Sequence, residues 1–132
     1  MKYLLFPTIL ILTLLSTNNA QAQFTGPSSF RTATTVSEVI EDARRLDRQD
    51  ALVKLRGFVV EQINEDEFWF EDATGRVRLE IEPQYMPATP FDHTTELVIM
   101  AEVDFDLLDG TEIEAKRILF ASEYDALSEE QR

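Results

Sequence analysis

Apolar and polar side chains alternate along most of the chain after residue 52, which is the period of β-strands with one buried face. The clearest segment is a β-hairpin. Phe68 and Phe70 precede an Asp-Ala-Thr-Gly turn at residues 72–75, and from Val77 apolar residues alternate with charged ones. The same period predicts five strands, the first beginning at Leu52 and the others at about residues 67–71, 76–82, 96–104 and 112–120.

A helix is predicted before the first strand. Thr35 and Glu38 have the spacing of a capping box, in which each side chain accepts a hydrogen bond from the other residue's backbone amide. Apolar residues then recur at helical spacing with charged residues between them, so we expect a helix from Val36 to about Leu46. Prolines interrupt the segment at residues 83–95, which argues against a helix there and predicts an irregular crossing loop.

The predicted fold class is mainly β, a small five-stranded OB-type Greek-key barrel preceded by one N-terminal helix. Closure into a barrel leaves no exposed sheet edge, which favours this fold over an open sheet. A small β-sandwich is the alternative. Gly57 lies within the first strand and predicts a bulge or a sharp bend there. Trp69 alternates with Phe68 and Phe70, so we expect it on the outer face of the barrel.

The first 22 residues have the three parts of a secretory signal peptide: Lys2 as the charged end, an apolar run at residues 3–15, and small residues ending at Ala22. The apolar run is shorter than the roughly 20 residues that span a bilayer. We therefore expect cleavage after Ala22 and a periplasmic protein without a membrane span. The expected organisation is a signal peptide (1–22), an extended lead-in (23–34), an OB-fold domain with its N-terminal helix (35–120) and an acidic C-terminal tail (121–132).

The composition is strongly acidic, with 12 Lys and Arg against 25 Asp and Glu and a formal net charge of −13. Lys2 is the only charged residue of the signal peptide, so cleavage lowers the net charge by one, to −14. Such a surface repels phosphate backbones, which argues against nucleic-acid binding and favours cationic partners. The sequence contains no cysteine, which excludes disulfides and thiolate metal sites.

Six short segments of the chain, taken in order, carry a family resemblance. They are Phe24-Thr25-Gly26-Pro27, Thr34-Thr35-Val36, Val53-Lys54-Leu55-Arg56-Gly57, Phe68-Trp69-Phe70-Glu71-Asp72-Ala73-Thr74-Gly75, Glu102-Val103-Asp104 and Ile113-Glu114-Ala115-Lys116-Arg117-Ile118. Behind an export signal, this order resembles the bacterial OB-fold (BOF) family of periplasmic stress-tolerance proteins, of the YgiW/YdeI type. The resemblance implies a small monomeric barrel that acts by binding. It also implies a role in tolerance of peroxide, metal, acid or cationic-peptide stress.

Trp69 is the leading candidate for ligand contact, because OB barrels commonly bind ligands on the face of strands two and three through aromatic side chains. Arg56, Arg78 and Tyr85 are expected near it. The ligand would be a peptidoglycan fragment, an envelope protein or a cationic molecule. The alternative is that Trp69 only packs against a neighbouring segment, as large aromatic side chains usually do.

An acidic cluster is the other candidate site, formed by Asp104, Asp106, Asp109 and Glu112. Calcium prefers carboxylate and carbonyl oxygens, so divalent-cation binding is the alternative function. The spacing departs from that of an EF-hand loop, which favours a solvated acidic turn. With no cysteine and His93 as the single histidine, no nucleophile is paired with a base. We therefore expect neither enzymatic activity nor a cofactor.

Overall fold

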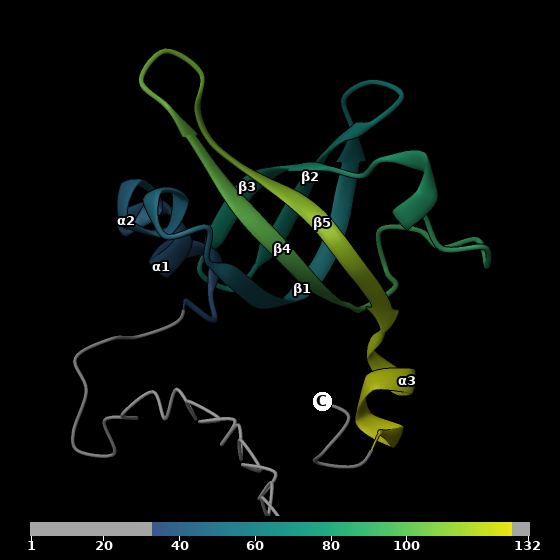
Figure 1. The fold of residues 1–132 in the computed structure, drawn as a ribbon. Coiled ribbons are helices and arrows are strands. Elements are labelled where there is room, and N and C mark those ends of the chain that lie inside the picture. Colours follow the sequence, from purple (N-terminus) through teal and green to yellow (C-terminus); the bar gives the residue numbers. More distant parts are fainter. Residues whose placement is uncertain (1–32, 128–132) are drawn as a thin grey trace, which may run out of the picture.

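Five strands close into a barrel in the order β1-β2-β3-β5-β4, with β3 and β5 parallel and the other neighbouring pairs antiparallel (Figure 1). The strands are β1 (Leu52–Gln62), β2 (Glu67–Asp72), β3 (Gly75–Glu80), β4 (Leu97–Asp106) and β5 (Gly110–Phe120). This computed structural model describes residues 33–127. The prediction of a five-stranded OB-type barrel is confirmed.

The expected signal peptide, at residues 1–22, lies outside the described residues. The same holds for most of the expected lead-in, up to residue 32, and for the end of the expected tail, at residues 128–132. Within residues 33–127, no helix has the length and apolar character needed to cross a membrane.

Two short helices precede the barrel where a single helix was expected. They are α1 (Val36–Glu41) and α2 (Ala43–Arg48), and they meet at Asp42, whose φ of −103° and ψ of 11° depart from helical values. Aspartate is a poor helix former, which is consistent with a break at this position. The Asp42 carboxylate pairs with Arg45 of α2 at 2.6 Å. The capping box is present: Thr35 Oγ1 accepts from the Glu38 amide at 3.3 Å, and the Glu38 carboxylate accepts from the Thr35 amide at 3.2 Å.

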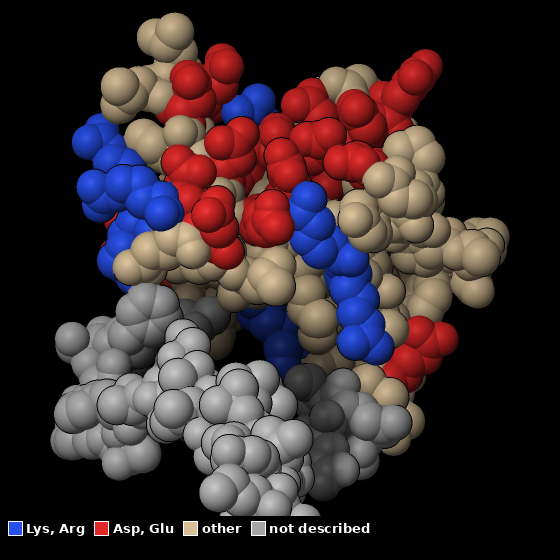
Figure 2. Space-filling model, viewed as in Figure 1, with Lys and Arg blue, Asp and Glu red and all other residues tan. Residues whose placement is uncertain are grey.

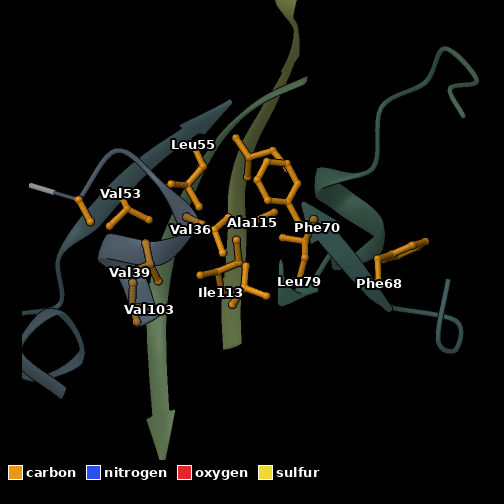
Figure 3. Packing of buried hydrophobic residues seen from close by; sticks show 14 of the residues in the cluster. Val36, Val39, Val53, Leu55, Phe68, Phe70, Leu79, Val103, Ile113 and Ala115 are labelled. Atoms are coloured by element: carbon orange, nitrogen blue, oxygen red, sulfur yellow. The ribbon is translucent and has the colours of Figure 1, made fainter. Parts of the chain in front are cut away.

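The helices close one end of the barrel with their apolar stripe. Val36 and Val39 of α1 and Leu46 of α2 are almost fully buried, and Figure 3 shows the first two beside core side chains of β1, β4 and β5. Phe70 fills the barrel interior and is fully buried. Phe68 lies apart from the other labelled side chains of Figure 3, on the side of the crossing loop. The crossing loop is therefore the place where the core approaches the surface.

Gly57 does not form the predicted bulge. It pairs regularly with Leu97 of β4, and the register of β1 against β2 shifts later, between Val59 and Glu61. The glycine is required for another reason, because a Cβ atom at this position would collide with the carbonyl oxygen of Glu71 and lie 2.9 Å from Cζ of Phe70. The residue therefore permits a close approach of two strands.

The crossing loop contains one short 3-10 helix, η1 (Pro83–Tyr85), where only irregular structure was expected. Proline at the first position of a helix is well tolerated, because its missing N–H would have no partner there. After β5 the chain continues as α3 (Ala121–Ala126), within the expected acidic tail. Its first amide, that of Ala121, donates to the carbonyl of Glu96 at 2.9 Å, which fixes the start of the helix to the end of the crossing loop.

Candidate functional site

Trp69 lies half-buried on the outer face of β2, between Glu61 of β1 and Arg78 of β3. The guanidinium carbon of Arg76 lies 5.6 Å from the centre of the indole ring, within the range of a cation–π contact. Arg76 also pairs with Glu71 at 3.2 Å and with Glu61 at 4.0 Å. The ring therefore faces outward, as the alternation predicted, and is surrounded by an ion-pair network.

Arg78 is the direct cross-strand neighbour of Trp69. Its guanidinium donates to the carbonyl oxygen of Asp109 at 2.7 Å and lies 3.9 Å from the carboxylate of Glu112. These contacts tie β3 to the turn between β4 and β5. The structure thus brings together two of the four predicted contact residues, Trp69 and Arg78.

Arg56 and Tyr85 lie in other surroundings. The Arg56 guanidinium contacts the Glu96 carboxylate at 2.5 Å and both carboxylate oxygens of Asp125, at 2.8 and 3.0 Å. These bonds to Asp125 and Glu96 raise the pKa of Arg56, and they join β1 to α3. Tyr85 packs half-buried against the core from η1, with Nζ of Lys116 5.9 Å from its ring centre. Arg56 is therefore a structural link to α3 in this arrangement.

A row of carboxylates crosses the barrel beside Trp69 and Arg78, and sequence reasoning missed it. The strand register places Glu67 of β2 opposite Glu80 of β3, Glu80 opposite Glu114 of β5, and Glu114 opposite Glu102 of β4. Lys116 offsets part of the negative charge of this row, because its Nζ lies 3.3 Å from the carboxylate of Glu114 and 3.6 Å from that of Glu102. Figure 2 shows acidic side chains gathered over the upper part of the side on which β4 and β5 lie in front in Figure 1.

Two glutamates of this surface, Glu80 and Glu112, have a raised pKa, chiefly because they are partly buried. Burial raises the pKa of Glu112 to about 7, hydrogen bonding to Glu67 adds to the shift, and Arg78 opposes it. Burial and then the charge of Glu114 also raise the pKa of Glu80. We call the outer surface formed by Glu67, Trp69, Arg78, Glu80 and Glu112 the Trp69 face. It combines an aromatic ring with a field that favours protons and cations.

The predicted acidic cluster between β4 and β5 has a different structure. Asp106 Oδ1 accepts from the backbone amides of Leu108 and Asp109, at 2.6 and 3.0 Å, and so shapes the turn. Asp104 lies across the strand pair from Glu112. In the part of the chain that the structure describes, no three His, Cys, Asp or Glu side chains form a group that could hold a metal ion. The turn therefore does not gather the predicted metal ligands.

Comparison with known proteins places this barrel in a family. The sequence matches the family described as Bacterial OB fold (BOF) protein over residues 14–119. The chain belongs to this family. The Calcium-regulated OB-fold protein CarO of Pseudomonas aeruginosa is 35% identical over 116 residues, which cover 88% of this chain and 95% of that protein. Protein YgiW of Escherichia coli K12 is 31% identical over 105 residues, covering 74% of this chain and 79% of that protein.

A solved structure supports the same assignment. The structure of the hypothetical protein ygiW from E. coli superposes with a TM-score of 0.57 at 35% sequence identity. The match covers 76% of this chain and 100% of that one. The resemblance to the YgiW type that the sequence segments suggested is thus confirmed for this BOF protein.

Proposed function

We propose that this BOF protein is a non-catalytic periplasmic binding protein that contributes to envelope stress tolerance and binds cationic ligands on the Trp69 face. The observation that carries the proposal is the pairing of Trp69 with Arg78 inside a field of carboxylates from three strands. The names of the related proteins describe no catalytic activity. A binding role is also in keeping with a fold whose ligands commonly contact strands two and three.

The chemistry of the face favours a ligand with both positive charge and an apolar or flat part. The carboxylates of Glu67, Glu80 and Glu112 would attract the charge. The guanidinium of Arg76 already lies 5.6 Å from the centre of the Trp69 ring, so a ligand cation would replace Arg76 there or stack on the rest of the indole. The formal charge of the chain, −13 before cleavage of a signal peptide, adds long-range attraction for cations. Divalent cations belong in the test as well, since the name of one relative calls that protein calcium-regulated.

The binding experiment uses the emission of Trp69, which is the only tryptophan of the chain. Cationic peptides, divalent cations, peptidoglycan fragments and oligonucleotides are titrated in separate runs. We expect a saturable emission change with a cationic ligand, weakened by salt because the attraction is electrostatic. The double variant Glu80→Gln and Glu112→Gln should weaken binding at least tenfold, whereas Glu123→Gln on α3 should not. A response to oligonucleotides alone, or to none of these ligands, would contradict the proposal.

The cellular experiment tests compartment and stress role together. A strain lacking the gene is complemented with the natural chain or with the Glu80→Gln, Glu112→Gln variant and exposed to peroxide, metal, acid or cationic peptide. We expect lower survival without the gene under at least one stress, restored by the natural chain only. Fractionation should place the processed protein in the periplasm. Unchanged survival under all four stresses would refute the stress role while leaving the binding result to stand separately.

A further inference from the structure

The first half of β1 closes the barrel against β4, but the second half of the strand keeps an open edge, which the predicted closure did not include. β1 pairs with β4 only from Leu52 to Gly57, because β4 begins at Leu97. Residues 58–62 pair with β2 on one side. On their other side, no backbone hydrogen bond between described residues joins them to the crossing loop. An unpaired strand edge presents a row of N–H and C=O groups on which another strand can form.

A groove of about 540 Å³ lies along this edge, between β1 and residues 86–93 of the crossing loop. Figure 1 shows both segments on the same side of the barrel. Its apolar lining includes Val59 and Phe68, each 7% exposed, together with Met86 and Phe91, which pack half-buried against the core. The groove therefore reaches the part of the core where Phe68 lies apart from the other aromatic and aliphatic side chains (Figure 3).

The rim of the groove is acidic. Glu61, Glu65 and Asp92 line it and are all exposed. Hydrogen bonds from Thr94 lower the pKa of Asp92, so this carboxylate stays charged. Glu61 forms a long ion pair of 4.0 Å with Arg76. Among the described residues that line the groove, His93 is the only basic one, and none is Lys or Arg. Charge complementarity thus favours a basic occupant.

We propose that this groove binds an extended peptide segment with alternating basic and apolar side chains, which adds as a strand to residues 58–62 of β1. Successive side chains of a strand point to opposite faces, so one set would enter the apolar groove and the other would meet the acidic rim. Main-chain hydrogen bonds to the open edge would supply affinity, and the groove would select the side chains. This groove is a second binding site, separate from the Trp69 face. The proposal for the groove does not depend on whether the Trp69 face binds a cationic ligand.

The irregularity at Val60 fits this role. The register of β1 against β2 shifts between Val59 and Glu61, so the strand is distorted at the middle of the open edge. Bulges of this kind are common at sheet edges and next to binding sites, where they redirect side chains. Here the bulge lies on the groove itself, since Val60 is part of its lining.

The experiment uses a synthetic peptide of four Lys-Val repeats with blocked ends and the purified full chain. Binding is followed by amide NMR shifts and by hydrogen exchange. We expect saturable shifts at residues 58–62 and at the non-proline residues of 86–93, and slower exchange of the β1 amides on the open edge. A peptide with the same side chains but methylated at alternate backbone nitrogens should bind at least tenfold more weakly, because it cannot form the ladder. Equal binding of both peptides, or no binding at all, would overturn the proposal.

Variants distinguish binding through the acidic rim of the groove from attraction by the overall negative charge of the protein. Glu61→Lys with Glu65→Lys should weaken binding of the Lys-Val peptide at least tenfold, whereas Glu123→Lys on α3, with the same charge change per residue, should alter it less than twofold. If the double variant does not fold, the single variant Glu65→Gln replaces it. The comparison with the methylated peptide uses the natural chain and therefore tests the proposal in either case. Shifts confined to Trp69 and Arg78 would refute this site. So would protection of the β1 edge by concentration-dependent dimers without peptide, which would identify a second copy as the occupant.

Discussion

The carboxylate of Asp72, in the turn of the β2–β3 hairpin, accepts a hydrogen bond of 2.8 Å from the backbone amide of Val36, the first residue of α1. Its other oxygen accepts from the amides of Thr74 at 2.7 Å and Gly75 at 3.2 Å. The Thr74 hydroxyl in turn accepts from the amide of Ser37 at 3.0 Å. One side chain therefore shapes the hairpin turn and satisfies the N-terminus of the helix that closes the barrel.

Replacing Asp72 by alanine is expected to lower the free energy of unfolding by about 2 kcal/mol, because it removes both a helix cap and the bonds that fix the turn. Urea unfolding followed by circular dichroism measures the loss. Asp104→Ala is the matched control, since Asp104 is an exposed aspartate on β4; it should change stability by less than about 0.5 kcal/mol. Equal losses in the two variants would contradict the role of Asp72.

The contribution of Asp72 should also depend on pH. Partial burial acts to raise the pKa of Asp72, but the hydrogen bonds from Thr74, Val36 and Gly75 outweigh it, and the pKa is lowered. A lowered pKa in the folded state means stability that is complete above the unfolded value of about 4 and is lost as the pH falls through the folded value. The difference between the natural chain and Asp72→Ala should therefore be larger at pH 7 than at pH 2.5. A constant difference over this range would refute the linkage.

Gly57→Ala is expected to be severely destabilising, by about 3 kcal/mol, because the added methyl group would collide with backbone that cannot move independently. Gly75→Ala, at the start of β3, provides the control. A Cβ at Gly75 would lie 3.5 Å from Cγ1 of Val36, which is an ordinary contact, and its φ is not positive. Thermal unfolding of both variants should show a large decrease in melting temperature for Gly57→Ala only.

Local pattern was sufficient to predict the strands of the barrel and their buried faces. The alternation around Phe68 and Phe70 depends on neighbouring residues alone, and it correctly placed Trp69 on the outer face. The capping box at Thr35 is equally local. The break at Asp42 was missed because apolar residues continue at helical spacing on both sides of it, so the periodicity carries no sign of an interruption.

The candidate site was harder to predict because it depends on contacts between distant segments. Arg56 was expected near Trp69, but its partner Asp125 is 69 residues away on α3, and no pattern in the sequence indicates where that helix packs. The row from Glu67 to Glu114 likewise requires the register of β3 against β5, which are parallel and far apart in the chain. The alternating glutamates of each strand were visible in the sequence, but their alignment across strands was not.

The turn between β4 and β5 should show no specific affinity for calcium. Asp106 already accepts two backbone hydrogen bonds, and the neighbouring carboxylates are not gathered around a common point. Adding calcium should therefore shift the melting temperature of the natural chain and of the Asp104→Asn, Asp109→Asn variant by the same small amount. Calorimetric or thermal titration makes the comparison. Stabilisation that saturates with calcium and disappears in the variant would reverse this conclusion, since linkage requires it for a specific site.

Glu112→Gln should make the protein more stable at alkaline pH. The pKa of Glu112 is raised to about 7 by burial and by Glu67, with Arg78 opposing the shift. In the unfolded chain the pKa of a glutamate is about 4.3, so the folded state binds the Glu112 proton more tightly than the unfolded state does. The free energy of unfolding therefore falls as the pH rises from about 4.3 to 7. Glutamine removes this loss and keeps a hydrogen-bond donor for Glu67. Melting temperatures of the variant and the natural chain should agree near pH 4 and differ by several degrees at pH 8.

Glu123→Gln on α3 is the control, and its curve of melting temperature against pH should stay parallel to that of the natural chain. If Glu112→Gln also gives a parallel curve, the titration of the Trp69 face is not governed by Glu112.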